Sequence, residues 1–291
     1  MRWRGVCLGL VVIAAVMSAG PSPVAAQLSE RLQQTMLQGQ NGDLYRRFGR
    51  MLVDEGRELD IDPAAGVDEA RKTLLRRAAL YENLKDFARA EIDLASAVQL
   101  DPPSAELYRA RGYFYMRRGR FTEALGDFLV GIRLAPDNAR VRFGAGRAQA
   151  RLGNYAEAVR HYDAAIKLAQ REPTYYLSRG EAYIHLDQAR SAWADFDAAI
   201  EIRLPRMADR YYAFLGRGFA ALMMTQYENA IADFDSAIGL DPRAVNALLW
   251  RGYARERNGQ AGLALDDYER ATSVDPSDRL ARANVQRLRS N

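Results

Sequence analysis

Cysteine is nearly absent from this sequence of 291 residues. The single cysteine, Cys7, lies in an apolar segment near the N-terminus, so residues 27–291 contain no thiol. This absence excludes a cysteine nucleophile, a disulfide framework and a thiolate metal site from the main part of the chain. A chain without thiols also suits an oxidising compartment.

Histidine is scarce as well. The two histidines, His161 and His185, are well separated in the sequence, and neither has a neighbouring cysteine or histidine that would complete a metal site. Surface imidazoles are the simpler interpretation of both residues. We therefore expect no bound metal and no cofactor.

An excess of charge of one sign is also missing. The chain has 41 Lys and Arg residues against 37 Asp and Glu residues. Residues 1–26 contribute Arg2 and Arg4 and no acidic residue, so residues 27–291 carry 39 − 37 = +2. Such a small excess provides no electrostatic basis for binding nucleic acid or an anionic membrane.

The apolar run Val6–Met17 is shorter than the ~20 residues that a membrane-spanning helix needs. Arg2 and Arg4 precede this run, and the small residues of Val24–Ala26 follow it. This order is typical of a secretory signal peptide. We predict that residues 1–26 are removed by cleavage after Ala26, which leaves a periplasmic or secreted protein without a stable membrane span. The alternative is an uncleaved anchor or a buried N-terminal helix.

The dominant feature of the remaining chain is an internal repeat. Gly112, Gly146 and Gly180 recur at one constant interval, because 146 − 112 and 180 − 146 are equal. The same interval relates two further sets of three residues, Ala124, Ala158 and Ala192, and Phe128, Tyr162 and Phe196. Extending this register defines six units, residues 71–104, 105–138, 139–172, 173–206, 211–244 and 245–278. The one interruption is four additional residues, Met207–Arg210.

Each unit has the pattern of two helices. In the unit 105–138, Gly119 suits the turn after a first helix, because glycine tolerates the left-handed backbone that ends helices. Thr122 can cap a second helix, and Pro136 blocks its continuation. Glycine at unit position 8 and alanine at position 20 allow close helix contact, and large residues at positions 17 and 24 fill the adjacent space. One such hairpin cannot bury both of its faces, so neighbouring units must stack.

This pattern resembles the tetratricopeptide repeat family over residues 71–278. The residues that match the family pattern include Gly112, Tyr115, Gly119, Phe121, Ala124, Phe128, Leu134 and Pro136. The resemblance implies an all-α fold, a right-handed superhelical solenoid of antiparallel helix pairs. Single positions depart from the pattern at Ala78, Gly131, Gln170 and Leu204.

Two segments flank the repeats. Residues 27–70 are predicted to form an N-terminal helical cap or a degenerate repeat, since Gly39 falls on position 8 when Pro63 is placed in register. Residues 279–291 are amphipathic and rich in arginine, and they are predicted to contain a C-terminal capping helix.

An arginine at position 7 and an aspartate at position 23 recur together in five of the six units. The five pairs are Arg77 and Asp93, Arg111 and Asp127, Arg179 and Asp195, Arg217 and Asp233, and Arg251 and Asp267. The third unit departs at both positions, with Ala145 and His161. This joint loss predicts that the two positions form structural ion pairs, either within one hairpin or across to a neighbouring one, which the planar guanidinium suits. The alternative is two independent preferences on solvated faces.

No residue pattern in the chain points to catalysis. The string Gly216–Ala221 (GRGFAA) lies inside a repeat helix, whereas a dinucleotide fingerprint must follow a strand. The carboxylates recur with the repeat, as structural residues do, and a catalytic pair should be singular. We therefore predict no catalytic residues and a protein that is not an enzyme.

The resemblance also implies where a partner binds. In the family, positions 2, 5, 9, 12 and 13 of the first helices line a concave groove. The second and third units contribute a basic zone with aromatic residues, Arg109, Tyr113, Arg117, Arg140, Phe143, Arg147 and Arg151. The fourth to sixth units contribute an apolar zone, Leu177, Ile184, Tyr212, Leu215, Phe219, Leu222, Met223, Leu249 and Tyr253. The apolar zone is either an exposed strip or part of the core between repeats.

These patterns predict a scaffold or adaptor of the cell envelope that holds a protein or peptide with apolar anchors and an acidic end. The alternatives are a holdase-like periplasmic chaperone and a self-assembling repeat array. The sequence leaves the partner and the oligomeric state open.

Overall fold

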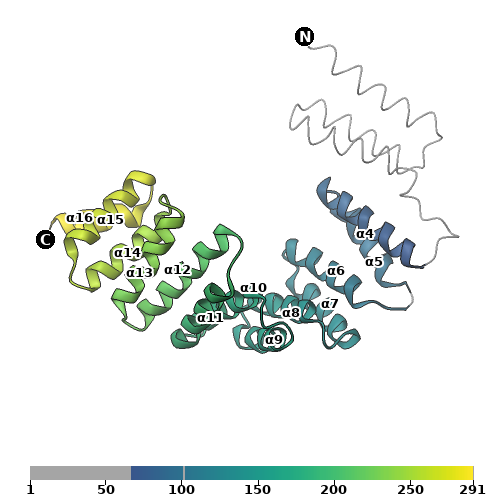
Figure 1. Ribbon diagram of the computed structural model, residues 1–291. Coiled ribbons are helices and arrows are strands. Elements are labelled where there is room, and N and C mark those ends of the chain that lie inside the picture. The colour runs from purple at the N-terminus through teal and green to yellow at the C-terminus, as the bar shows by residue number, and fades with distance from the viewer. Residues whose placement is uncertain (1–66, 101, 291) are drawn as a thin grey trace, which may run out of the picture. The chain divides into compact units, whose positions relative to one another are not determined.

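The computed structural model describes residues 67–100 and 102–290, and these residues form 13 α-helices and no strand (Figure 1). The expected all-α class is confirmed. The predicted signal peptide and nearly all of the predicted N-terminal cap lie outside the described residues. Among the described helices, none is long and apolar enough to cross a membrane.

The chain divides after Pro103 into two compact units. The described part of the first unit is one helix pair, α4 (Val67–Asn83) and α5 (Phe87–Val98). The second unit contains five further pairs and a last helix: α6 (Ala105–Arg117) and α7 (Phe121–Leu134), α8 (Ala139–Arg151) and α9 (Tyr155–Leu168), α10 (Pro173–His185) and α11 (Ala189–Ile202), α12 (Met207–Met223) and α13 (Tyr227–Leu240), α14 (Val245–Arg257) and α15 (Ala261–Val274), and α16 (Arg279–Arg289).

Each first helix is followed by a residue with left-handed backbone at unit position 15. Gly119, Gly153 and Gly259 have φ angles of +74°, +82° and +77° at this place. In the other units the same place is taken by non-glycine residues with φ near +60°, which are Lys85, Asp187 and Thr225. The tight turn is therefore required by the hairpin, and three units form it without the residue that adopts it most easily.

The four additional residues 207–210 do not form a loop. They are the first turn of α12, which has 17 residues. The other first helices of this half of the chain, α6, α8, α10 and α14, have 13 residues each. Leu204, which replaces the expected terminating proline of the repeat 173–206, is buried in a core cluster with Leu177 and Phe196. The interruption thus lengthens a helix that remains in register.

The core is built around one aromatic ring in each repeat of the second unit, at position 24. Phe128, Phe196 and their counterparts are almost fully buried, at 2% exposure or less. Each ring lies against the position-8 glycine of its own first helix, so that a Cβ on Gly112 would lie 2.9 Å from Phe128. The ring also contacts the next first helix, because a Cβ added to Gly144 would overlap Phe128 and one added to Gly216 would overlap Phe196. Two glycines from successive repeats therefore enclose one ring and hold the repeats together.

Candidate functional site

The first helices of the second unit contact one another directly: α6 meets α8, α8 meets α10, α10 meets α12 and α12 meets α14. Within this unit, each second helix packs against its own first helix and against the first helix that follows, or against α16 in the case of α15 (Figure 1). The side chains of α6, α8, α10, α12 and α14 that are not buried in the core therefore form one surface, which we call the first-helix face.

One end of the first-helix face, on α6 and α8, is basic and aromatic. Arg140 and Arg147 are exposed, and the Arg147 guanidinium carbon lies 5.9 Å from the Phe143 ring centroid. Arg109 lies 5.9 Å from the Tyr113 ring centroid and forms an ion pair with Glu106 at 2.5 Å. Burial raises the pKa of Tyr113, although the Arg147 and Arg109 guanidinium groups act in the opposite direction. Cations from both helices therefore lie near one half-buried phenol.

The remaining basic residues of this end lie at the C-terminal ends of α6 and α8. Arg117 and Arg151 are both exposed. The Arg151 guanidinium carbon lies 4.4 Å from the Phe121 ring centroid, in cation–π distance. Arg151 is thus held against the turn between α6 and α7, apart from the ring of Phe143.

An acidic residue separates the two ends of the face. Glu181 of α10 is exposed, and it occupies the same unit position as Tyr113 and Arg147. Burial together with the Glu181 carboxylate raises the pKa of Tyr212 on the neighbouring helix α12. The centre of the face therefore disfavours a further negative charge.

The other end of the face, on α12 and α14, is aromatic. Trp250 and Tyr253 are 38% and 43% exposed. Their rings are perpendicular, with centroids 6.1 Å apart, and the Trp250 ring meets Phe219 edge to face at 5.0 Å. We call Phe219, Trp250 and Tyr253 the aromatic triad.

The apolar zone is less exposed than a continuous strip would require. Leu177, Leu222 and Leu249 are buried, and so is Phe143 in the basic zone. These four side chains are members of the buried hydrophobic clusters between the helices. Ile184, Leu215, Phe219 and Met223 are half-buried, and Tyr212 is 38% exposed. Accessible apolar surface is thus concentrated on α12 and α14.

Sequence reasoning missed Trp250, which lies at unit position 6, outside the positions that the family uses for its groove. The signal was present in the sequence. Position 6 is Arg76 in the first unit, then a small residue in the next four (Ala110, Gly144, Ser178 and Gly216), and tryptophan in the last unit alone.

The arginine at position 7 and the aspartate at position 23 form bidentate ion pairs in all five units that have them. In the first, Arg77 Nε and Nη2 donate to the two oxygens of Asp93 at 2.8 and 2.6 Å. The other four pairs repeat this arrangement. All five carboxylates are buried and their arginines are half-buried. The pairs hold the two helices of each repeat in register.

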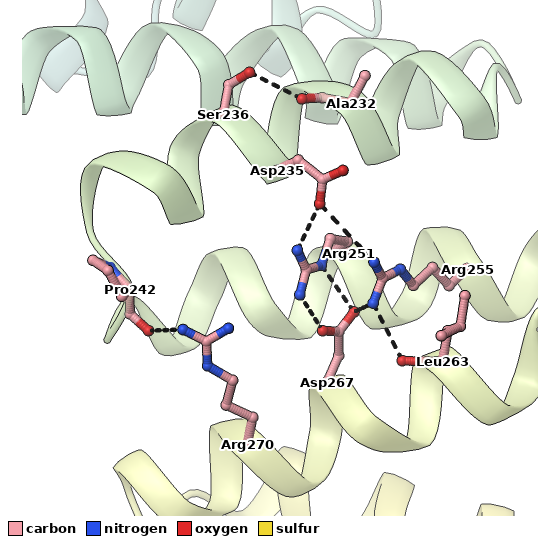
Figure 2. Close-up of polar contacts among 9 residues, drawn as sticks. All are labelled: Ala232, Asp235, Ser236, Pro242, Arg251, Arg255, Leu263, Asp267 and Arg270. Carbon is pink, nitrogen blue, oxygen red and sulfur yellow. Dashed lines mark hydrogen bonds and ion pairs between the residues drawn. The ribbon is translucent and has the colours of Figure 1, made fainter.

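A second carboxylate connects successive repeats. Arg179 also donates to Asp163 of the preceding repeat at 2.6 Å, and Arg217 donates to Asp197 at 2.5 Å. Figure 2 shows the same bridge in the last repeat, where Arg251 lies between Asp235 and Asp267. These acidic residues are at position 25, which is Ala95 in the first repeat and Leu129 in the second.

The third unit lacks its own arginine, with Ala145 at position 7, but it contributes Asp163 to the next repeat. At the other end of the series, Glu269 at position 25 accepts hydrogen bonds from Arg289 of the capping helix α16. The recurring acid at position 25 was the sequence signal for this connection. It was overlooked because its partner lies in the next repeat.

The electrostatics of these pairs follow from their burial. Burial opposes the charge of Arg179, but hydrogen bonds to Asp195 and Asp163 outweigh it and raise the pKa of the guanidinium. Burial raises the pKa of Asp195, and Arg179 acts in the opposite direction. The Arg179 guanidinium is paired with two carboxylates and does not face a ligand, so these pairs fix the register of the helices.

The two histidines lie in different surroundings. His161 is half-buried, and burial and the nearby Arg142 lower its pKa, with Glu157 opposing them. His185 is exposed and stacks on Tyr155 with centroids 4.1 Å apart. Within residues 67–100 and 102–290, no group of three or more His, Cys, Asp or Glu side chains is arranged to hold a metal ion.

Solved structures similar to this chain share its fold. One is YrrB, described as a tetratricopeptide repeat protein with an unusual peptide-binding site; it is 18% identical, with a TM-score of 0.58 over 66% of this chain and 97% of its own. The Cut9–Hcn1 hetero-tetramer of the APC/C is 16% identical, with a TM-score of 0.63 over 98% of this chain and 52% of that chain. MamA from Desulfovibrio magneticus RS-1 is 23% identical, with a TM-score of 0.55 over 60% and 97%.

A comparison with curated proteins found no match. The family model described as tetratricopeptide repeat matches residues 75–139, 143–205 and 215–279, which together are more than half of the chain. These segments contain both the paired helices and the glycine-enclosed rings that join them. The chain belongs to the tetratricopeptide repeat family.

Proposed function

We propose that this protein is a non-catalytic scaffold or adaptor that binds a peptide or protein partner on its first-helix face. The observation that supports this most directly is the gathering of exposed arginine and aromatic side chains on helices α6, α8, α12 and α14. The charges used for stability are paired elsewhere, in the Arg–Asp pairs between helices. Arg140 and Arg147 do not belong to these pairs, and both are exposed on the first-helix face.

The composition of the face suits a polypeptide ligand. Arginine and aromatic residues are enriched where proteins bind one another, because both offer a large planar surface together with a polar group. A solenoid presents such residues at regular intervals along an extended surface, which an extended or helical segment can follow. We propose that the partner has apolar anchors and an acidic end.

The proposed location is the periplasm or the outside of the cell. It depends on residues 1–26, which have the pattern of a secretory signal. We expect the mature protein, purified from its native cell, to begin at Gln27 by N-terminal sequencing and intact mass. A mature protein that retains Val6–Met17 contradicts a cleaved signal.

Photo-crosslinking in the native cell tests the binding face. A photoreactive residue is placed at Arg147 or at Phe219, and in a control at Arg190, which is exposed on the second helix α11. We expect the first two positions to capture the same partner and Arg190 to capture none. Arg147→Glu and Phe219→Glu should each reduce recovery of that partner, while Arg190→Glu should not.

Each variant is first compared with the native protein by circular dichroism, so that lost binding is not confused with lost folding. Capture of many unrelated unfolded proteins would favour a holdase over a scaffold. Recovery that is unaffected by both Arg147→Glu and Phe219→Glu contradicts the proposal.

A further inference from the structure

We infer that the aromatic triad of Phe219, Trp250 and Tyr253 is the socket for the apolar anchor of the partner, and that the partner crosses the face as an extended chain with its carboxylates at Arg140 and Arg147. This inference rests on the proposed function and adds a binding site, a charge order and a spacing to it.

The first support is the departure of Trp250 from the packing rule of its position. Position 6 is small in the four repeats before the last one, and in two of them a ring from the repeat before lies against it, as Phe128 does at Gly144 and Phe196 does at Gly216. Trp250 does not enter that space. Its ring remains 38% exposed and lies against Phe219 and Tyr253. Position 6 of the four repeats before the last one is occupied by a small residue. The Trp250 side chain at this position lies partly at the surface, so core packing alone does not explain it.

The second support is the surface that the triad offers. Trp250 and Tyr253 are 38% and 43% exposed, and Trp250 packs edge to face against Tyr253 of its own helix and Phe219 of α12. The charged residues that follow on α14 are already engaged, since Glu256 accepts hydrogen bonds from Arg287 and Arg257 donates to the Tyr227 hydroxyl. An uncharged aromatic surface of this kind suits an aliphatic or aromatic side chain, whose burial there is favourable.

The third support is the distribution of charge along the face. Arg140 and Arg147 are exposed on α8, Glu181 is exposed on α10, and the triad on α12 and α14 is uncharged. A partner with carboxylates is attracted to α8 and repelled at α10, so its acidic residues must lie at one end. The apolar anchor then falls at the other end, over the triad.

The contacts between first helices set the distance between the two sites. Packed helices lie about 8–10 Å apart, and α8, α10, α12 and α14 contact each other in turn. The path from α8 to the boundary of α12 and α14 is therefore about 25 Å. An extended chain advances about 3.3 Å per residue, so about eight residues separate the carboxylates from the anchor. A helical ligand, with a rise of about 1.5 Å per residue, would need about 17 residues.

Synthetic peptides of defined spacing test this inference on the full-length protein. Each fluorescein-labelled peptide has two aspartates, a Gly/Ser spacer and a Leu-Phe pair, and both chain directions are made. The spacer is lengthened in steps from well below the extended-chain requirement of about eight residues up to the helical requirement of about 17 residues. Fluorescence anisotropy gives the dissociation constants. We expect the tightest binding near a spacer of ~8 residues, set by the extended-chain length, and weaker binding on either side.

Variants assign each end of the peptide to its site. Trp250→Ala should weaken the best peptide by ~10-fold or more, as loss of a tryptophan anchor does, and should not affect a peptide whose Leu-Phe pair is replaced by Gly-Ser. Arg147→Glu should weaken the best peptide and should not affect one whose aspartates are replaced by serine. The control for Trp250 is Leu263→Ala, because Leu263 is 48% exposed on the second helix α15.

Several outcomes overturn the inference. One is an affinity that does not depend on spacer length, and another is an optimum at the helical length instead of the extended one. A third is equal weakening by Trp250→Ala and Leu263→Ala. If the protein associates with itself in sedimentation and Trp250→Ala abolishes this, the triad is a contact between copies. If Arg147→Glu reduces recovery of the cellular partner while Trp250→Ala does not, the proposed function stands, and the assignment of the aromatic triad as the binding site of the apolar anchor is wrong.

Discussion

Asp267 is the acceptor at the centre of the last Arg–Asp pair, and its removal should be far more costly than removal of its neighbour Asp235. Asp267 is 2% exposed and accepts hydrogen bonds from Arg251 Nε at 3.0 Å and Nη2 at 2.5 Å, and from Arg255 Nη1 at 2.9 Å (Figure 2). The Asp235 side chain is 49% exposed and accepts from Arg251 at 2.6 Å. Both carboxylates contact Arg251, but Asp267 is buried and also accepts a hydrogen bond from Arg255, so its removal leaves more buried charge without a partner.

Breaking a buried ion pair from one side leaves an uncompensated charge and costs about 3–5 kcal/mol. We expect Asp267→Ala to fall near the lower end, about 3 kcal/mol, because Arg251 keeps Asp235 as a partner. An exposed pair contributes up to about 1 kcal/mol, so Asp235→Ala should cost no more than that. Replacing both Arg251 and Asp267 by apolar residues of similar size, as in Arg251→Met with Asp267→Leu, should recover most of the loss.

Urea unfolding followed by circular dichroism measures these differences. With a slope of about 3 kcal/mol per molar urea, a loss of about 3 kcal/mol moves the midpoint by about 1 M. Repeat proteins can unfold in parts, so amide hydrogen exchange of α14 and α15 should be measured alongside. Two results contradict this prediction. One is an equal loss in the free energy of unfolding for Asp235→Ala and Asp267→Ala, and the other is a loss of less than about 1 kcal/mol for Asp267→Ala.

Two further predictions concern the turn after α12 and the half-buried histidine. Thr225 is β-branched and has a φ angle of +57°, so Thr225→Gly should relieve strain of about 1 kcal/mol and raise Tm by about 2–4 °C in a thermal scan; an unchanged or lower Tm contradicts this. Burial lowers the pKa of His161 below its ordinary value of 6.5, so the unfolded chain takes up a proton first as pH falls. The stability of the native protein should therefore decrease below pH 6.5, and His161→Gln should lessen that decrease; equal pH profiles of unfolding contradict it.

The sequence was sufficient to predict the helix pairs. The predicted cap at Thr122 was wrong, because α7 begins at Phe121 with Arg120 at its N-cap and Thr122 lies within the helix. The constant spacing of Gly112, Gly146 and Gly180 reflects a steric need, because each glycine lies where a Cβ would meet an aromatic ring. Gly119 also indicated the turn at position 15. Lys85, Asp187 and Thr225 gave no such indication, although the backbone has the same left-handed conformation there. Local sequence patterns are informative here because the contacts within each helix pair join residues close in the sequence.

The candidate site was predicted less completely. The basic end on α6 and α8 contains Arg140 and Arg147 at exposed positions, as the family register implies. The apolar end was assigned too widely, because the register cannot show that Leu177 and Leu222 turn into the core. Trp250 was overlooked because its position serves packing in the other repeats.

The repeat and its two helices followed from the sequence alone, since both depend on spacing within one unit. The same spacing suggested an ion pair between positions 7 and 23, but the sequence did not place that pair within one helix hairpin. Only the tertiary structure decided how neighbouring units share residues. It placed Asp163 beside Arg179 and Asp235 beside Arg251, and it left the Trp250 ring exposed beside Phe219. Exposure and contacts between repeats depend on how the helix pairs stack, and this stacking is a property of several units together that no single unit encodes.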